Sequence, residues 1–396
     1  MSIRRVDQIE LKGKRVFVRV DYNVPLDDKG GITDDTRITA SLPTVRYVIE
    51  AGGRVLLASH LGRPKGKRDP RYSLAPVARR LAELLGCKVT LAEDCVGETV
   101  EKQVEALQPG EVLLLENLRF HAEEEKNDEA FSRALASLCD VYVNDAFGAA
   151  HRAHASTEGM TRFLPVVAAG FLMMKEVESL ERVLSRPEVP YVAILGGAKV
   201  SDKIGVIENL LERVSALLIG GGMAYTFLKA QGVEVGKSLV EPDQIDLARG
   251  LLERAKGKVA FLLPSDHVCA EKMDVQAPRR VVKNGEIPAD WVCLDIGPET
   301  VVRFVAEIRK AKTLVWNGPM GVFEMEPFSH GTFAVAKAVA EAEAFSVVGG
   351  GDSVAAVNQS GVAAKISHIS TGGGASLEFL EGKALPGIES LKKEQR

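Results

Sequence analysis

The sequence repeats one local pattern: a short apolar, β-branched run, a loop rich in glycine or asparagine, and a stretch with helical spacing. Near-continuous apolar strands that alternate with helices are typical of a parallel sheet whose two faces are both covered. The pattern therefore predicts an α/β fold. The predicted strands are Arg15–Val20, Arg54–Ala58, Val112–Leu115, Val141–Val143, Tyr191–Leu195, Ala216–Ile219, Val259–Leu263, Thr313–Val315 and Phe345–Val348.

The length of the chain predicts more than one domain. A chain of 396 residues is too long for one compact core. We expect two doubly wound parallel-sheet (Rossmann-like) domains, residues 1–170 and 190–376, joined by a helix and hinge in residues 171–189. Apolar residues recur at helical spacing through Phe171–Leu184, which predicts the joining helix. A second helix is predicted at Leu42–Ala51, which ends at two glycines.

Composition excludes several classes of protein. The net charge of −4 argues against a general nucleic-acid binder, which usually carries a basic excess. No stretch approaches the roughly 18 apolar residues that span a membrane, and the first residues have no apolar signal region. We expect a soluble, cytoplasmic protein without a membrane or nucleic-acid partner. The cysteines show no C-x-x-C pair or zinc-ligand spacing, so we expect reduced, mostly buried thiols: Cys87, Cys95, Cys139, Cys269 and Cys293.

Polar residues gather where the strands of the first half end. Ligands of open parallel sheets bind beyond the carboxyl ends of the strands. Four ends carry residues of this kind: Asp21, Asn23, His60, Leu61, Gly62, Arg63, Arg119, His151, Arg152 and His154. Together they predict a concave, cationic site for a small substrate with phosphate or carboxylate groups. The alternative is that each arginine is a solvated surface residue.

The strand ends of the second half are glycine loops instead. Glycine allows backbone N–H groups to approach an anion closely, and a helix N-terminus adds partial positive charge. The loops are residues 196–199, 220–222, 349–352 and 372–374. If a helix starts near Lys199, Lys199 and Lys203 share one face and could hold a phosphate chain. Asp352 is a candidate Mg²⁺ ligand.

Two common nucleotide motifs are absent from the sequence. Gly236-Lys237-Ser238 ends like a Walker A loop, but Gln231 stands where glycine is required. Gly220–Gly222 lacks the third glycine of a dinucleotide fingerprint, so a tight packing turn is the favoured interpretation there.

Nine segments together resemble the phosphoglycerate kinase family, in the family's order and over essentially the whole chain. They are DYNVP (21–25), DDTRI (34–38), SHLGRP (59–64), ENLRF (116–120), AHRAHAST (150–157), LGGAKVSDKI (195–204), WNGPMGVFE (316–324), GGGDS (349–353) and STGGGAS (370–376). The resemblance implies reversible phosphoryl transfer from 1,3-bisphosphoglycerate to ADP, giving 3-phosphoglycerate and ATP, with Mg²⁺. It also implies a monomer, a 3-phosphoglycerate-binding first domain, a nucleotide-binding second domain, and a segment 377–396 that packs back on the first domain.

The resemblance also implies roles for single residues. The substrate-binding set would be Asp21, Asn23, Arg37, His60, Leu61, Gly62, Arg63, Arg119 and Arg152. The catalytic set would be Arg37, which faces the group in transfer, Lys199, which accompanies it, and Gly373, behind it at a helix N-terminus. The nucleotide set would be Lys203, Glu324, Gly350, Gly351, Asp352 and Ser353, with Asp352 towards Mg²⁺.

The mechanism expected from these residues needs no general base. The acceptor carboxylate is already ionised near neutral pH, because its reference pKa lies near 4. Positioning and charge neutralisation after the domains close would then carry catalysis. Two alternatives remain: a nicotinamide dehydrogenase, which lacks its fingerprint here, and a nucleotide-binding or scaffold protein without activity. The second alternative predicts loss of Arg37, Lys199 or Asp352, and all three are present.

Overall fold

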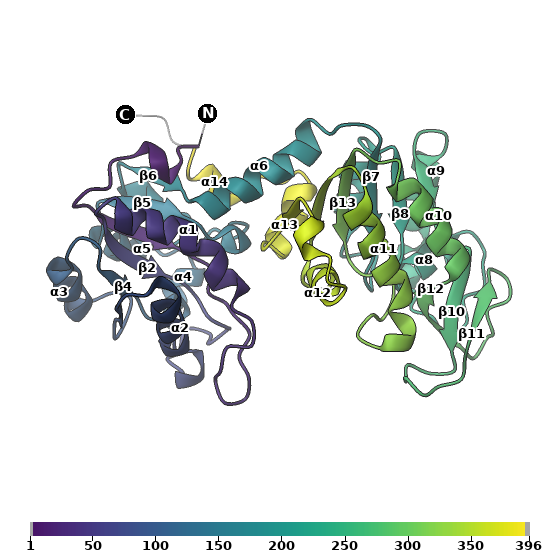
Figure 1. Cartoon of the computed structure of the whole chain (residues 1–396), viewed down its shortest axis with the longest axis horizontal. Helices are drawn as coiled ribbons and strands as arrows, with labels where there is room; N and C mark the ends of the chain where they lie inside the picture. Colours follow the sequence, from purple (N-terminus) through teal and green to yellow (C-terminus); the bar gives the residue numbers. More distant parts are fainter. Residues whose placement is uncertain (1–2, 393–396) are drawn as a thin grey trace. The chain divides into compact units, whose positions relative to one another are not determined.

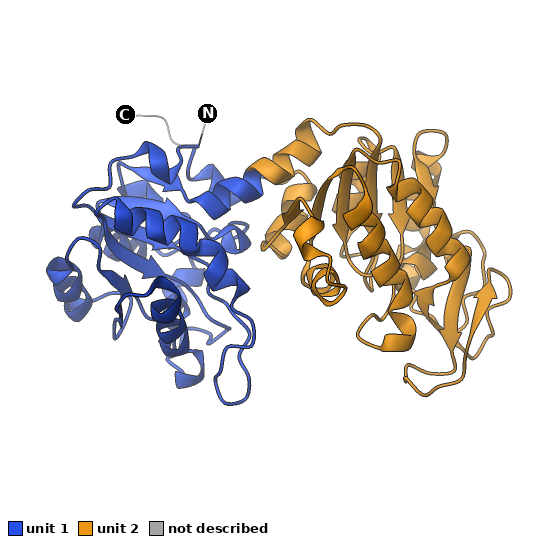
Figure 2. Ribbon diagram, viewed as in Figure 1, with its two compact units in different colours: residues 1–177, 384–396 blue, residues 178–383 orange. Residues whose placement is uncertain are grey.

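A computed structural model describes residues 3–392 of the chain (Figure 1). The chain divides into two compact units, coloured separately in Figure 2. Unit 1 contains the described residues up to Val177 and those from Ala384 onward, and unit 2 runs from Glu178 to Lys383. Helix α6 (Phe171–Ser185) begins in unit 1 and ends in unit 2, and the chain crosses back to unit 1 between Lys383 and Ala384, so the units have two covalent links.

Unit 1 is built on a six-stranded parallel sheet with the order β3-β4-β2-β1-β5-β6. Alternate strand residues, such as Val16 and Val18, join one core cluster with residues of α1 and α2. The intervening residues, such as Phe17 and Tyr142, are fully buried on the opposite face. Burial on both faces explains the near-continuous apolar runs. The strands are β1 (Arg15–Arg19), β2 (Arg54–Ala58), β3 (Val89–Leu91), β4 (Val112–Leu114), β5 (Val141–Asn144) and β6 (Val167–Ala169).

The connections of unit 1 are helical. Its α-helices are α1 (Thr36–Glu50), α2 (Ala75–Leu85), α3 (Glu98–Ala106), α4 (Ala122–Glu125), α5 (Glu129–Ser137) and α14 (Pro386–Glu389). Short 3₁₀ helices are η1 (Val6–Gln8), η2 (Pro70–Tyr72), η3 (Leu118–Phe120), η4 (Phe147–Ala149) and η5 (Gly159–Phe163). Helix α14 returns to this unit after all of unit 2, and Gly387 N donates to Ala150 O at 2.8 Å.

Unit 2 repeats the design with a second six-stranded parallel sheet, ordered β15-β14-β13-β7-β8-β9. Its core gathers alternate strand residues such as Ile194 and Trp316 with Phe304 and Val335 from the helices. The strands are β7 (Tyr191–Leu195), β8 (Ala216–Ile219), β9 (Ala260–Leu262), β13 (Thr313–Asn317), β14 (Phe345–Gly349) and β15 (His368–Ile369).

The helices of unit 2 flank this sheet in Figure 1. They are α7 (Ile204–Leu211), α8 (Met223–Ala230), α9 (Ile245–Ala255), α10 (Pro298–Ile308), α11 (His330–Glu341), α12 (Gly351–Gln359) and α13 (Gly374–Leu380), with 3₁₀ helices η6 (Pro242–Gln244), η7 (Glu326–Phe328) and η8 (Ala363–Lys365). Among the residues that the structure describes, no helix combines the length and apolar character needed to cross a membrane.

A small antiparallel sheet in unit 2 was not predicted. It has the order β11-β10-β12, formed by β10 (Asp266–Ala270), β11 (Arg279–Lys283) and β12 (Val292–Ile296). The α/β fold with two parallel sheets is confirmed, and the nine predicted strands all exist with ends within two residues. The predicted helix at residues 42–51 is too short, because α1 starts at Thr36 and continues through Pro43.

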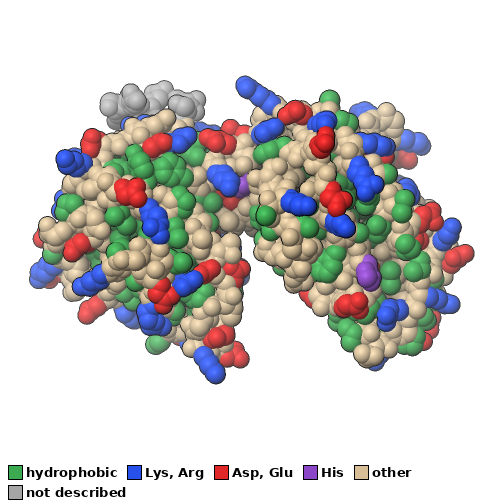
Figure 3. All heavy atoms as spheres, in the orientation of Figure 1, with side chains coloured by type: hydrophobic (Ala, Val, Ile, Leu, Met, Phe, Trp, Pro, Cys, Tyr) green, Lys and Arg blue, Asp and Glu red, His purple; other side chains and the backbone are tan. Residues whose placement is uncertain are grey.

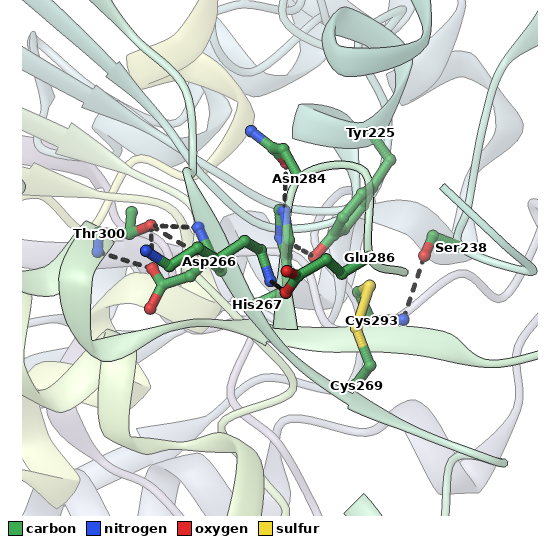
Figure 4. Close-up of a disulfide and its surroundings, with 10 residues drawn as sticks. Tyr225, Ser238, Asp266, His267, Cys269, Asn284, Glu286, Cys293 and Thr300 are labelled. Carbon is green, nitrogen blue, oxygen red and sulfur yellow. Dashed lines mark hydrogen bonds between the residues drawn. A yellow bond between two sulfur atoms is a disulfide. The ribbon is translucent and has the colours of Figure 1, made fainter. Parts of the chain in front are cut away.

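The structure also corrects the prediction that all five cysteines are reduced. Cys269 and Cys293 face each other on β10 and β12, with Cα atoms 3.9 Å apart, and form a disulfide (Figure 4). The spacing of these cysteines could not reveal the bond, because antiparallel pairing of the strands brings them together. Cys87, Cys95 and Cys139 are free.

The expected segment 377–396 divides between the two units. Residues 377–383 belong to unit 2, and those from Ala384 onward belong to unit 1, while residues 393–396 lie outside the described part. On the face shown in Figure 3, acidic and basic side chains are interspersed over each unit, in keeping with the small net charge.

Candidate functional site

The sheet of unit 1 has a topological switch point between β1 and β5. The chain builds outward from β1 through β2, then returns to place β5 on the other side of β1. Loops that leave the carboxyl ends of such strands diverge and leave a crevice for a ligand. Strand β1 leads into Asp21 and β2 leads into His60, so two of the predicted site residues follow neighbouring strands.

Asp21 and Asn23 fix the loop that follows β1. The Asp21 carboxylate accepts a hydrogen bond from Arg37 Nη1 at 2.6 Å, and Arg37 stands in the first turn of α1. Burial raises the pKa of Asp21, but the positive charges of Arg37 and neighbouring residues outweigh this effect and lower the pKa overall. Asn23 Oδ1 accepts from Gly62 N at 2.8 Å and ties this loop to the one after β2. The structure thus brings four predicted residues together.

His60 is buried beside a second arginine, Arg19, in β1. Arg19 Nη2 lies 3.2 Å from His60 Nδ1. A guanidinium can only donate, so Nδ1 must accept and the ring proton is on Nε2. Burial lowers the pKa of His60 well below its ordinary value, and repulsion from Arg19, Arg119 and Arg152 acts in the same direction, against the attraction of Asp21. A neutral His60 can therefore donate one hydrogen bond to an anionic ligand.

The other three arginines predicted for the site differ in environment. The Arg119 side chain is only 3% exposed, and its Nη1 donates to Gly62 O at 2.8 Å. Arg152 is half-buried, and its Nε donates to His151 Nε2 at 3.1 Å, which orients the guanidinium. Arg63 is exposed. The alternative that each arginine is a solvated surface residue is therefore wrong for Arg119. Its buried charge acts on His60 and Arg152.

Sequence reasoning missed the residues that support this cationic group. Arg19 Nε donates to Ser156 Oγ at 2.8 Å, and Ser156 in turn donates from N and Oγ to the fully buried Glu124 carboxylate. Asn117 Oδ1 accepts from the backbone N–H groups of Leu61 and Arg119. The signal for Arg19 was available, because a charged residue interrupts the apolar run RVFVRV.

A cavity of about 800 Å³ adjoins these residues in unit 1. Its lining includes Asn23, Leu61 and Gly62 from the predicted set, and Tyr72 and Arg79 from η2 and α2. A Cβ at Gly62 would lie 2.3 Å from the Tyr72 ring, and Gly62 has a φ of +62°, so glycine is required there. The cavity borders the loops after β1 and β2, but its lining includes none of His60, Arg119 and Arg152.

Unit 2 has its own switch point between β7 and β13. The loops that leave these strands pack backbone against backbone: a Cβ at Gly196 would lie 2.1 Å from Pro319 O, and one at Gly318 would lie 2.2 Å from Gly196 O. Gly221 has a φ of +67° and packs against Gly197. The glycines at 196, 221 and 318 therefore serve close backbone packing, as favoured for Gly220–Gly222 from the sequence.

The prediction that Lys199 and Lys203 share a helix face is wrong. Helix α7 begins at Ile204, after a series of turns, so Lys199 lies outside it and is exposed. Lys203 precedes the helix, is 8% exposed, and its Nζ hydrogen-bonds Asn317 Oδ1 at the end of β13. Burial lowers the pKa of Lys203 to about 8, against the opposing attraction of Asp202 and Asp352.

The loop after β14 brings Gly350–Ser353 to the same switch point. A Cβ at Gly350, with φ +90°, would lie 3.0 Å from Asn317 Nδ2. This buried Nδ2 lacks a hydrogen-bond partner among the described residues. A side chain at position 350 would crowd this amide group, whereas glycine leaves it uncovered. An N–H donor without a partner at such a position is suited to an anionic ligand such as a phosphate. Ser353 instead accepts from Gly318 N and holds the loops together.

Three further predicted residues of unit 2 are Glu324, Asp352 and Gly373. Glu324 is exposed, and its loop is attached to the antiparallel sheet through Val322 N, which donates to Leu294 O at 2.8 Å. Gly373, with φ +52°, directly precedes α13, so the prediction that it lies at a helix N-terminus is confirmed. Asp352 is exposed in the first turn of α12, close enough to attract Lys203.

The family model described as "Phosphoglycerate kinase" matches residues 6–383. The chain belongs to the phosphoglycerate kinase family. It is 60% identical over 396 residues to a phosphoglycerate kinase of Anaeromyxobacter sp. (strain K), covering 99% of this chain and 100% of that protein. It is 62% identical over 392 residues to that of Moorella thermoacetica, covering 99% of each. The solved phosphoglycerate kinase of Coxiella burnetii superposes with a TM-score of 0.90 at 44% identity, covering 98% of this chain and 99% of that one.

Membership of the phosphoglycerate kinase family defines the reaction. The chain is a glycolytic kinase that transfers a phosphoryl group reversibly between 1,3-bisphosphoglycerate with ADP and 3-phosphoglycerate with ATP. Its substrates are therefore a small phosphorylated acid and a nucleotide. Both are anions, which agrees with a buried cationic group in one unit and glycine loops with a buried lysine in the other.

Proposed function

We propose that unit 1 binds the phosphoglycerate and unit 2 binds the nucleotide. The observation that carries this division is the different chemistry of the two switch points. In unit 1, Arg37, His60, Arg119 and Arg152 surround the ends of β1 and β2, where guanidinium groups can pair with carboxylate and phosphate. In unit 2, the donor groups are Lys203, the Asn317 amide and loop backbone.

In this proposal the substrate-binding residues act by charge and hydrogen bonding. They are Asp21, Asn23, Arg37, His60, Leu61, Gly62, Arg63, Arg119 and Arg152. Asp21 orients Arg37 through their 2.6 Å ion pair, and Arg37 faces the phosphoryl group in transfer. His60 donates Nε2–H to the substrate, because its Nδ1 is occupied by Arg19. Arg119 is held by Gly62 O and is already desolvated, so little ordering is needed when the anion binds.

The nucleotide-binding residues proposed in unit 2 are Lys203, Glu324, Gly350, Gly351, Asp352 and Ser353. Lys203 neutralises the phosphates, the 350–351 backbone approaches them, and Glu324 meets the ribose. Asp352 would hold Mg²⁺, since magnesium bound with a nucleotide usually takes one or two carboxylates from the protein. The metal would supply charge neutralisation on the phosphate oxygens. The exposed carboxylate of Asp352 and the free donor of Asn317 fit a magnesium–phosphate group.

Catalysis in this proposal rests on position and charge rather than on proton transfer. The acceptor carboxylate is ionised near neutral pH, and the phosphoryl oxygens carry the charge that needs to be stabilised. Arg37, Lys199 and the backbone at Gly373 provide that stabilisation. Since the substrates bind to different units, the proposal includes closure of the two units before transfer, with α6 and the loop near Thr371 as hinges.

An activity assay with 3-phosphoglycerate and ATP, coupled to detection of ADP, tests these roles. We expect Arg37→Ala and Lys199→Ala each to lower kcat by about 10²–10³, the effect of removing one well-placed donor. Both side chains are at least partly exposed, so thermal unfolding should change little. Arg133→Ala and Lys229→Ala, which remove an exposed and a partly exposed charge elsewhere in each unit, should retain activity. An unchanged kcat in either test variant would contradict its assigned role.

The proposal also covers assembly and location. We propose a monomer that acts in the cytoplasm without a membrane or nucleic-acid partner. Light scattering during size-exclusion chromatography should give the mass of one chain, 42.7 kDa. A mass of twice that value at low micromolar concentration would contradict the monomer.

A further inference from the structure

Unit 1 contains a group of three side chains with metal-binding chemistry outside the proposed substrate site. Asp94 and Cys95 follow β3, and His121 directly follows η3. One ligand atom from each residue, the carboxylate oxygen, the thiol sulfur and an imidazole nitrogen, lies within 4.8 Å of the other two. We propose that Asp94, Cys95 and His121 form a binding site for a divalent transition-metal ion of the zinc class.

The three groups already converge on one point. His121 Nε2 lies 2.6 Å from Asp94 Oδ1, and the backbone N–H of Cys95 donates to the same oxygen at 2.7 Å. In a tetrahedral zinc site, O, N and S ligand atoms lie about 3.3–3.6 Å apart, given metal–ligand distances of about 2.0–2.3 Å. The 2.6 Å contact would therefore open by roughly 1 Å, which a rotation of two partly exposed side chains provides.

The surrounding structure holds the ligands in place from separate elements. Asp94 O accepts from Glu116 N, and Ala92 N donates to Leu114 O, so the residues after β3 continue along β4. The His121 ring stacks on Phe131 of α5, with centroids 5.2 Å apart. Few rotamers then have to be ordered when an ion binds.

The three side chains differ in exposure, so an ion bound between them would be buried on one side and open to solvent on the other. Cys95 is fully buried, whereas the side chains of His121 and Asp94 are 28% and 36% exposed. An ion can enter past the imidazole and carboxylate, and solvent can supply a fourth ligand. Three protein ligands with one open position are a common arrangement for zinc.

The ligand set distinguishes this site from the magnesium site proposed in unit 2. Thiolate and imidazole suit zinc, cobalt and related ions, whereas magnesium requires oxygen ligands. A thiolate and a carboxylate also balance the charge of a divalent ion. When the ion binds, the Cys95 thiol releases its proton to solvent, and the neutral imidazole nitrogen coordinates through its lone pair.

The position of His121 connects the site to the substrate group. His121 lies two residues after Arg119, and its backbone N–H donates to Leu118 O within η3. A metal–imidazole bond would anchor the end of this short helix and hence the backbone that carries Arg119. We therefore expect bound zinc to raise the thermal stability of unit 1.

The simpler interpretation is an Asp94–His121 ion pair beside an uninvolved cysteine, and the experiment separates the two. The full chain, freed of metals and without nucleotide, is titrated with Co²⁺ and followed for thiolate-to-cobalt charge-transfer absorption, and Zn²⁺ is measured by equilibrium dialysis. We expect one ion per chain and the charge-transfer band. Cys95→Ser and His121→Asn should weaken Zn²⁺ binding by at least the roughly 10–100-fold reported for lost supporting residues of metal sites.

Cys139→Ser is the matched control, because Cys139 is also a free, buried thiol of unit 1. It should bind Zn²⁺ like the unmodified chain. Because the Co²⁺ spectrum is recorded on the unmodified chain, the test does not depend on any variant folding. Absence of the thiolate band, or Zn²⁺ binding that Cys95→Ser leaves unchanged, would overturn the proposal.

Discussion

Burial disfavours the charged form of Lys203. The residue is 8% exposed, and burial lowers the pKa of its ammonium group to about 8, although Asp202, Asp352 and Glu381 attract the charge. A negative phosphate chain placed beside this group would favour the protonated form and raise its pKa. Nucleotide binding and proton binding at Lys203 should therefore be coupled.

This coupling predicts proton uptake when ADP binds. At about pH 8.5 much of Lys203 is neutral in the free protein, so bound ADP should draw a proton from the buffer. At about pH 6.5 the lysine is already charged, and its contribution should vanish. Calorimetric titration in two buffers of different ionisation enthalpy measures the uptake. Lys203→Met should abolish it and the exposed Lys229→Met should not; equal uptake by all three proteins would contradict a role for Lys203.

Candidate site residues could be proposed from the sequence where they follow a strand, and were overlooked where they lie within a strand or pair with distant residues. Asp21, His60 and Arg119 could be found because they lie one to five residues after predicted apolar strands. Arg19 was missed although it is buried and contacts His60, because a side chain within a strand can point to either face. Glu124 was missed because its partner Ser156 is 32 residues away, beyond any local pattern.

Some secondary-structure elements could be predicted from the sequence and others could not. Nine of the twelve strands in the two parallel sheets were predicted, because both faces are buried and the runs are apolar. The strands β3, β6 and β15 were missed, because each is a short run of two or three residues at a sheet edge. The antiparallel sheet was not predicted, because exposed β11 reads RRVVK and β10 contains Asp266 and His267. Those two polar side chains are buried but paired, with Thr300 and with Tyr225 and Asn284 (Figure 4). The helix proposed from Lys199 failed because the turn before α7 extends to Lys203.

The disulfide between β10 and β12 yields a prediction about the small sheet. Cys269 and Cys293 are 24 residues apart, and closing a loop of that length is expected to contribute about 3–4 kcal/mol through the unfolded state. A dithiol reductant should therefore lower the urea midpoint of the oxidised protein. Cys293→Ala should remove the sensitivity to reductant, and Cys139→Ala should keep it. Identical midpoints with and without reductant in the unmodified protein would contradict the contribution.

At the scale of the whole molecule, the proposed binding of the two substrates to different units predicts a change in size. With 3-phosphoglycerate and ADP together, which cannot react, the radius of gyration should fall because the units close on the ligands. Each ligand alone should produce a smaller change. Small-angle X-ray scattering measures both conditions on the same sample. No compaction with both ligands at saturating concentration would count against closure.

Unit 1 is discontinuous along the chain, since all of unit 2 separates Val177 from Ala384. Leu385, Ile388 and Leu391 are buried, and Gly387 pairs with Ala150, so these late residues complete the core of unit 1. Domains usually mature in the order in which the ribosome releases them. Here the nascent chain must reverse that order: the half that is synthesised first is finished last, after the other half has had time to fold.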